Sequence, residues 1–261
     1  MEYMCEKTEN KRILIATDLH YCDKLWHNAG RKERMENFCR CINEEYSENP
    51  YDAILLLGDY SLDFWCWDTC GTYLNENPVS DTANYMKDVY PNFPLPAYMI
   101  PGNHEQYGNE KWKKITGFER QFSVVYGEYV FLMLDTFGGD LDPTEHSDGT
   151  YTGIDAEFLS TALDKHPDKK IVICAHDIIP EKEGEAAKKL IRENDRIICA
   201  FTGHTHRSNT VILDKSWRNL PVLYCGDFSY SAGRRPENPN WGYRIVDLEN
   251  GFSTEYKRAR I

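Results

Sequence analysis

Imidazole, carboxylate and amide side chains recur in this sequence directly after short runs of apolar residues. The pattern appears in Asp18-x-His20, Gly58-Asp59, Gly102-Asn103-His104-Glu105, His176 and Gly203-His204-x-His206. Five of the eight histidines lie in these segments. Nitrogen and oxygen donors without thiolate suit manganese, iron or zinc, and they offer too much nitrogen for calcium or magnesium. The residue types therefore predict a metal centre.

Gly203-His204-Thr205-His206 is the most specific of these segments. Alternate residues of an extended chain point to the same side, so His204 and His206 can face one ligand. Glycine lets the backbone approach that ligand closely because it has no side chain. Each of the other segments, taken alone, is more often a turn or a satisfied polar strand end than a metal ligand. Their occurrence together indicates one shared site.

Short apolar segments predict the strands that position these side chains. Residues 12–16 and 53–57 flank a segment, 30–48, in which apolar residues recur every three or four positions. That spacing is typical of a helix with one buried face. A β-α-β unit of this kind implies parallel strands whose ends face one way. The polar residues therefore fall where open α/β sheets bind their ligands.

Further along the chain, a β-hairpin is expected at 122–126 and 129–135, joined by Gly127-Glu128, and it marks a change from parallel to antiparallel pairing. Residues 60–96 are rich in aromatic side chains and predict an ordered, partly helical excursion. Additional strands are expected at 97–100, 170–175, 196–201, 221–225, 242–248 and 252–257.

The segment 136–153 is polar and glycine-rich and predicts a long loop, after which Asp155 is the expected cap of a helix. The sequence contains no internal repeat, low-complexity tract or linker. We therefore expect a single domain over residues 1–261, with the 60–96 excursion near the site.

Composition excludes several classes of partner. The chain has 261 residues with 42 acidic and 30 basic side chains, a net charge of −12. That charge argues against broad contact with a nucleic-acid polymer or an anionic membrane. The longest apolar runs are strand-sized, well below the roughly 20 residues of a membrane-spanning helix. No membrane association is expected.

The nine cysteines are an odd number scattered through a long chain, and the first residues contain no apolar stretch of signal-peptide length. These features predict a reducing, cytoplasmic setting. Cys39-x-Cys41 and Cys66-x3-Cys70 hint at thiolate ligands, but no pair of them has zinc-finger spacing.

Taken in order, the polar segments resemble the signature of the calcineurin-like metallophosphoesterase superfamily, over about residues 12 to 207. The resemblance implies a four-layer α/β/β/α sandwich of two mixed sheets flanked by helices. It also implies two divalent or trivalent metal ions, of manganese, iron or zinc, bridged by an aspartate and a hydroxide.

The same resemblance implies a role for each residue. One ion would be held by Asp18, His20 and His206, the other by Asn103, His176 and His204, and Asp59 would bridge them. The hydrolysis of a phosphate ester independently favours two cations. They neutralise the charge on the ester oxygens and lower the pKa of the water molecule between them. An alkoxide leaving group then needs a proton. His104, which is not a ligand in the family pattern, is the candidate general acid.

The sequence departs from the protein serine/threonine phosphatases of this superfamily, which have an aspartate and two phosphate-gripping arginines where this chain has Leu62, Asp63 and Pro101. We therefore predict hydrolysis of a small phosphodiester or nucleotide-like phosphate ester by direct attack of the metal-bridging hydroxide. A phosphomonoesterase of the same fold is the alternative, and a non-catalytic metal-binding scaffold is a further one.

Other residues have two interpretations. Arg207 and the pair Arg234-Arg235 are candidate substrate-binding residues or ordinary surface residues. Asp63 either orients His104 or is a solvated loop acid. The aromatic excursion either stacks a flat group of the substrate or forms a small satellite core.

Overall fold

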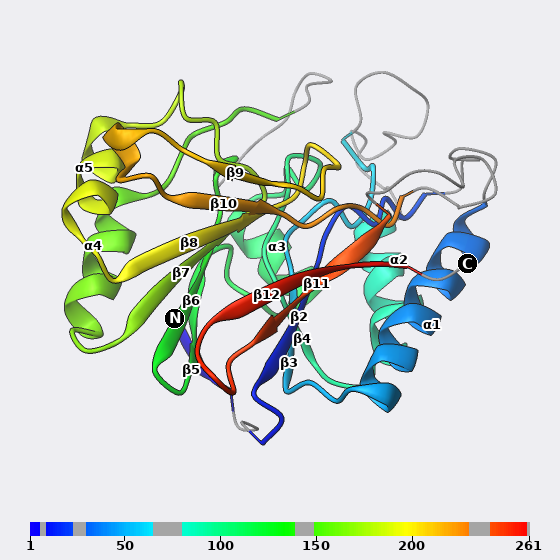
Figure 1. The fold of residues 1–261 in the computed structure, drawn as a ribbon. Helices are drawn as coiled ribbons and strands as arrows, with labels where there is room; N and C mark the ends of the chain where they lie inside the picture. Colours follow the sequence, from blue (N-terminus) through cyan, green and yellow to red (C-terminus); the bar gives the residue numbers. More distant parts are fainter. Residues whose placement is uncertain (6–8, 23–29, 65–79, 139–148, 230–240, 260–261) are drawn as a thin grey trace.

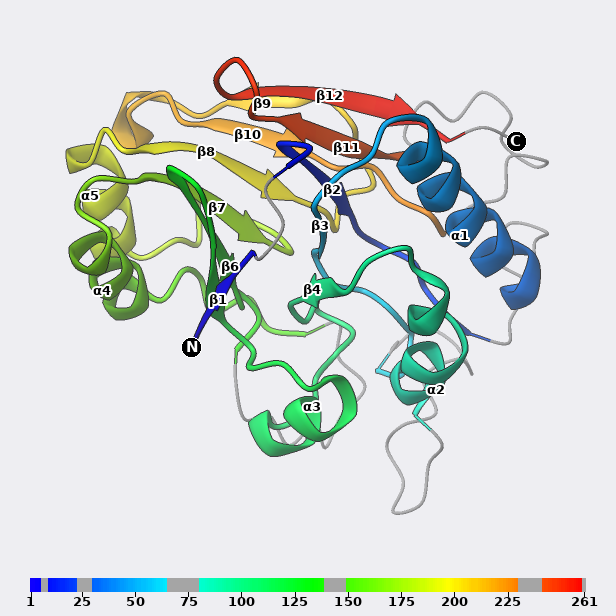
Figure 2. The ribbon, with the colours of Figure 1, turned by 90° about the horizontal axis from the view of Figure 1, so that it is seen from below.

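Two β-sheets lie face to face, and helices cover the outer side of each sheet (Figures 1 and 2). The computed structural model describes residues 1–5, 9–22, 30–64, 80–138, 149–229 and 241–259. The larger sheet has the order β1 (Glu2–Met4), β5 (Phe122–Tyr126), β6 (Tyr129–Leu134), β7 (Lys170–Ala175), β8 (Ile197–Thr202), β10 (Pro221–Tyr224) and β9 (Thr210–Ile212). The smaller sheet has the order β12 (Ser253–Arg258), β11 (Gly242–Asp247), β2 (Arg12–Ala16), β3 (Ala53–Leu56) and β4 (Ala97–Met99).

The helices divide between the two outer faces. They are α1 (Arg31–Glu48), α2 (Asp81–Asp88), α3 (Asn109–Thr116), α4 (Ala156–Lys165) and α5 (Glu185–Glu193). Figure 2 shows α4 and α5 outside the larger sheet and α1 and α2 outside the smaller one. Short 3₁₀ helices occupy Tyr90–Asn92 and Lys215–Trp217. The predicted four-layer α/β/β/α architecture is confirmed.

The side-chain alternation of β2 shows why the layers form. Successive residues of a strand point to opposite faces. Ile13 and Ile15 belong to the buried cluster between the two sheets, whereas Leu14 and Ala16 belong to the cluster under α1. A third cluster packs α4 and α5 against the larger sheet. A strand that is buried on both faces reads as a continuous apolar run, which is how the sequence presents it.

Strand direction agrees with the prediction in the smaller sheet and departs from it in the larger. β2, β3 and β4 are parallel, and β5 and β6 form the expected antiparallel hairpin with Gly127 at φ +56°. Beyond this hairpin the expected change to antiparallel pairing is wrong, because β7, β8 and β10 are parallel to their preceding neighbours in the sheet. The crossovers through α4 and α5 restore the parallel direction.

The aromatic excursion contributes to the main core where the structure describes it. Tyr60, Phe64 and Tyr85 are buried in the cluster that includes α1 and α2. These side chains pack in the interior and do not form a stacking surface. Residues 65–79 of the excursion lie outside the described residues.

In the described part of the chain, no helix combines the length and the apolar character that crossing a membrane requires.

Candidate metal centre

The strand ends of both sheets meet at the candidate site. Asp18 and His20 follow β2, Asp59 follows β3, and Asn103 follows β4, all in the smaller sheet. The larger sheet contributes the residues after β7 and β8, which are His176, His204 and His206. The fold therefore brings together all seven side chains expected as ligands, from positions up to 188 residues apart in the sequence (206 − 18 = 188).

The loops that present these side chains have an uncommon backbone conformation. Left-handed φ values occur at five of the seven expected ligands: Asp18 (56°), His20 (48°), Asp59 (56°), His204 (58°) and His206 (54°). Non-glycine residues adopt this conformation rarely, and it concentrates at functional sites because the surrounding fold imposes it. The backbone is thus shaped to aim these side chains inward.

Two glycines allow the loops to approach one another. A Cβ atom at Gly203 would lie 2.5 Å from Asp18 Oδ2, and one at Gly102 would lie 2.2 Å from Asp59 Oδ1. Neither contact is tolerable, so any side chain at these positions would push the loops apart. At Gly203 the close approach is to the side chains of Thr17 and Asp18.

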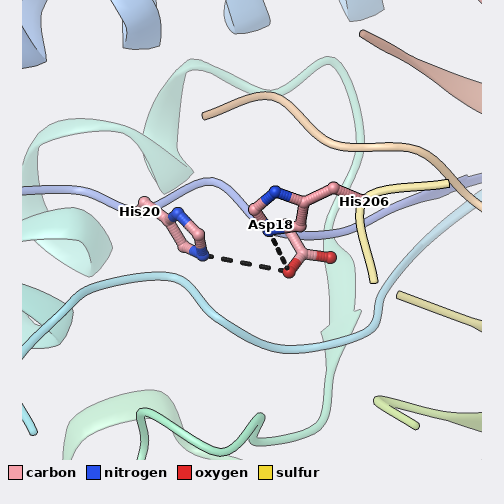
Figure 3. A group of neighbouring side chains, drawn as sticks. All are labelled: Asp18, His20 and His206. Atoms are coloured by element: carbon pink, nitrogen blue, oxygen red, sulfur yellow. Dashed lines mark ion pairs between the residues drawn. The ribbon is translucent and has the colours of Figure 1, made fainter. Parts of the chain in front are cut away.

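Asp18, His20 and His206 form the first group of ligand atoms (Figure 3). Asp18 Oδ1 lies 3.1 Å from His206 Nε2 and 3.8 Å from His20 Nε2. The carboxylate is buried, and both imidazole nitrogens point at the same oxygen. A cation placed among these three atoms would meet one carboxylate oxygen and two imidazole nitrogens, a donor set that suits manganese, iron or zinc.

Asn103, His176 and His204 form the second group. Asn103 Oδ1 lies 2.9 Å from His176 Nε2 and 2.9 Å from His204 Nδ1. The other ring nitrogen of His176 is 2.7 Å from the carbonyl oxygen of Leu57, which fixes the orientation of that imidazole. A backbone acceptor on the outer nitrogen of a ligand histidine is typical of metal sites.

Asp59 connects the two groups. Its Oδ2 lies 3.4 Å from His20 Nε2 and 3.3 Å from His176 Nε2, so it faces one histidine of each group. His104 Nε2 is 3.6 Å from the same oxygen, and the backbone N–H of His104 donates to Asp59 Oδ1. His20, Asp59 and His104 also have ligand atoms within 4.8 Å of one another.

Burial and neighbouring charges shift the pKa values in this cluster. Burial would raise the pKa of Asp18, but the imidazoles of His206 and His176 outweigh it and lower the pKa to about 2. Burial likewise opposes ionisation of Asp59, yet His104 and His176 hold its pKa well below the ordinary value. Both carboxylates are therefore ionised at neutral pH, as metal ligands must be.

The histidines are shifted in opposite directions. Burial lowers the pKa of His20 to about 4, so its imidazole is neutral and able to bind a metal. Burial also opposes charge on His176, but the Asp59 and Asp18 carboxylates outweigh it and raise the pKa to about 10. In this arrangement the His176 ring is therefore protonated on both nitrogens at neutral pH, and a bound cation would take the place of the Nε2 proton.

Glu105 ties the loops of the smaller sheet together. Its buried carboxylate accepts backbone N–H bonds from Asp59, Tyr60 and Ser61 and a fourth from Gly102, at 2.8 to 3.2 Å. It therefore joins the loop after β3 to the loop after β4. The sequence places Glu105 in the Gly-Asn-His-Glu segment, but its role was visible only from the backbone geometry.

Two further expectations have different outcomes. Asp63 is neither a solvated acid nor, in its described contacts, a partner of His104: its buried carboxylate accepts bonds from Ser80, Tyr107 and the backbone at the start of α2. Arg207 is exposed on the segment after His206. Arg234 and Arg235 lie outside the described residues.

Two residues that sequence reasoning missed lie against the second group. The Phe137 ring is 5.6 Å from both His176 and His204, measured between ring centroids. Asp177 Oδ2 is 3.9 Å from His204 Nε2. The position of Asp177 directly after His176 was the available signal, but its relation to His204 depends on how β7 and β8 pair.

The family of this chain is shown by a family-model match that covers most of it. The model of the calcineurin-like phosphoesterases matches residues 11–208. The chain therefore belongs to the calcineurin-like phosphoesterase family, as the sequence segments indicated, and all seven expected ligands and His104 fall within the matched range.

More specific relatives are distant. A probable glycerophosphodiester phosphodiesterase, GpdQ, of Arcobacter nitrofigilis is 24% identical over an alignment of 177 residues that covers 61% of this chain and 62% of that protein. This chain thus matches less than two thirds of that relative's length.

Solved structures support the fold. Purple acid phosphatase PPD1 from yellow lupin (Lupinus luteus) seeds has a TM-score of 0.58 at 15% identity, covering 95% of this chain and 51% of that one. GAP50, described as the anchor in the inner membrane complex of Plasmodium, has a TM-score of 0.57 at 14% identity, covering 95% and 84%. At these identities the likeness concerns the fold alone.

Proposed function

We propose that this protein is a dinuclear metal-dependent hydrolase that cleaves a P–O bond of a small phosphodiester or nucleotide-like phosphate ester. The observation that carries the proposal is the pair of ligand groups that share Asp59. Asp18, His20 and His206 present ligand atoms within 4.8 Å of one another, and so do Asp59, His176 and His204, which in each case is close enough to hold one ion. Asp59 faces both groups, as a bridging ligand must.

The residues fit two ions of manganese, iron or zinc. We assign Asp18, His20 and His206 to one ion, Asn103, His176 and His204 to the other, and Asp59 to both. Two bound cations would neutralise the charge of the ester oxygens and lower the pKa of a water molecule between them. The side chains of the cluster contribute by holding the ions at fixed positions on strand ends, so that little reorganisation accompanies the reaction.

His104 is proposed as the general acid. Its buried imidazole has Nε2 3.6 Å from Oδ2 of the Asp59 carboxylate. The backbone N–H bond to Asp59 Oδ1 holds residue 104 at that position. A histidine placed in this way can give a proton to the leaving oxygen as the P–O bond breaks. Water is the nucleophile, and no phosphoryl-enzyme intermediate is needed.

Two features support a diester or a nucleotide-like ester over a phosphoprotein. The distant relative GpdQ is described as a probable glycerophosphodiester phosphodiesterase. The protein serine/threonine phosphatases of the superfamily have arginines at the positions of Asp63 and Pro101. The Asp63 carboxylate instead accepts backbone N–H bonds at the start of α2. Arg207 remains the candidate for contact with the substrate, because it is exposed directly after the ligand His206.

The test compares hydrolysis of bis-p-nitrophenyl phosphate and p-nitrophenyl phosphate on one purified sample, with added Mn²⁺ and again after chelation. We expect turnover that is lost on chelation, restored by Mn²⁺ and faster for the diester. Asp59→Asn tests the shared ligand directly, since it keeps the shape of the side chain but removes its charge. It should abolish turnover and reduce the bound metal.

Each other outcome contradicts a specific part of the proposal. Faster hydrolysis of the monoester would replace the phosphodiesterase by a phosphomonoesterase. Turnover that survives complete chelation would contradict the metal-dependent mechanism. No turnover of either ester by folded protein loaded with manganese, iron or zinc would favour a non-catalytic scaffold.

A further inference from the structure

His204 is the least enclosed of the expected ligands. Its side chain is 30% exposed, compared with 19% for His206 and 4% or less for His20 and His176. Burial alone therefore does not fix the orientation of this imidazole. Something else must hold it if it is to serve as a ligand.

The two nitrogens of the His204 ring face different groups. Nδ1 lies 2.9 Å from Asn103 Oδ1 and so points into the second ligand group. Nε2 points the other way and lies 3.9 Å from Asp177 Oδ2. Asn103 Oδ1 is an acceptor, so Nδ1 carries the ring proton in this arrangement. A cation bound at Nδ1 would take the place of that proton, and the proton of the neutral ring would then be on Nε2, the side that faces the Asp177 carboxylate.

Asp177 is itself held firmly. Its side chain is 7% exposed, and Oδ1 accepts the backbone N–H of Ile178 at 2.8 Å. Its carbonyl oxygen accepts a bond from Thr136 Oγ1 at 2.9 Å. These contacts leave Oδ2 directed at His204, while the Phe137 ring packs against the same imidazole.

We propose that Asp177 is a positioning residue that orients the His204 imidazole and thereby sets the affinity of the second metal ion, the one assigned to Asn103, His176 and His204. The inference rests on the proposed dinuclear centre. Asp177 does not touch the ion or the substrate; it acts through His204. The two ions then depend on different supports, because the imidazole that faces the Asp177 carboxylate belongs to His204, a ligand of the second ion.

The test is a titration of metal-free protein with Mn²⁺ alone, followed by calorimetry and by the electron paramagnetic resonance signal of coupled manganese pairs. Asp177→Asn keeps the side-chain shape and the Oδ1 acceptor but removes the charge. We expect the second Mn²⁺ to bind about 10-fold or more weakly, as for other outer-sphere partners of ligand histidines. The first Mn²⁺ should bind as in the wild type, and the coupled signal should appear only at higher Mn²⁺ concentration.

Two controls separate positioning from general damage. Asp52→Asn removes another buried carboxylate, one that bonds Asn10, Lys11 and Tyr126, and it should leave both Mn²⁺ affinities unchanged. In a His204→Ala background, Asp177→Asn should have no further effect on the second ion, because coupled residues are not additive.

An unchanged second affinity in Asp177→Asn, or an equal loss for both ions, would overturn the positioning role while leaving the dinuclear centre intact. A wild-type protein that binds fewer than two Mn²⁺ would instead contradict the dinuclear centre, and the inference with it.

Discussion

Five of the residues proposed as metal ligands hold an unfavourable backbone conformation, and this strain lies within the candidate site. A left-handed non-glycine residue costs of order 1–3 kcal/mol and persists only where the surrounding fold imposes it. Asp18, His20, Asp59, His204 and His206 all have φ between 48° and 58°. The sequence identified these residues by type and spacing, but no feature of an Asp or His in a sequence reveals a left-handed backbone.

His104→Ala should separate proton donation from metal binding. For an ester with a poor, alkoxide-type leaving group we expect about a 10²–10⁴-fold loss in kcat, the usual contribution of a general acid. A p-nitrophenyl ester should lose much less, because p-nitrophenolate leaves without a proton. The measurement is kcat for both kinds of ester, together with the metal content of the variant.

The metal content decides between two roles for His104, because its ligand atoms also lie near those of His20 and Asp59. Full activity of His104→Ala on the alkyl ester would remove the general-acid role. Loss of one metal ion would make His104 a ligand.

At the scale of elements, strands with a continuous apolar sequence were predictable, whereas two short edge strands and two helices were not. β2, β3 and β7 are buried along almost their whole length, so their sequences reveal them directly. β1 and β9 have only three residues each and lie at sheet edges. Too few residues are present there to show an alternation.

Two helices were not predicted, for a related reason. α3 buries only Trp112 and Thr116, and α5 buries only Ala187 and Ile191. A single pair of buried residues four positions apart makes an apolar stripe too narrow to distinguish a helix from a loop in the sequence. The Asp177–His204 contact was also hidden, because it requires the register in which Cys174 of β7 lies beside Phe201 of β8.

Glu105→Gln should weaken the binding of metal ions by loosening two loops at once. Each carboxylate oxygen accepts two backbone N–H bonds, and an amide nitrogen in either place would meet donors. We expect about a 10-fold or greater loss in Mn²⁺ affinity and a loss of about 1–3 kcal/mol in the free energy of unfolding. Mn²⁺ titration and urea unfolding measure the two effects.

Glu183→Gln is the matched control for this change. Glu183 is also buried and accepts the backbone N–H groups of Ile154 and Gly184, but its described contacts include none of the expected ligands. It should lose stability and retain its Mn²⁺ affinity. Equal losses of affinity in both variants would show that Glu105 has no specific role in the site.

At the scale of the whole molecule, the proposed metal centre lies where the two sheets meet. Asp18, Asp59 and Asn103 come from the smaller sheet, whereas His176 and His204 come from the larger one. Between the sheets lies a buried apolar cluster that holds them together without metal. Bound ions would add links at the strand ends, where the loops are strained and several charges are buried.

Mn²⁺ should therefore raise the melting temperature of the metal-free protein. A free ligand at 100 times its Kd stabilises the folded state by about 2.7 kcal/mol, and in a chain of this size that corresponds to a rise of roughly 5–10 °C.

The rise in melting temperature should be larger at pH 8 than at pH 6. Burial opposes charge on His176, but Asp59 and Asp18 raise its pKa to about 10, so Mn²⁺ must displace a proton that is held more strongly at lower pH. Thermal unfolding of metal-free protein at both pH values, with and without Mn²⁺, measures the effect. Asp59→Asn should lose most of the rise, and an undiminished rise in that variant would mean that Mn²⁺ stabilises the protein from somewhere other than the junction of the sheets.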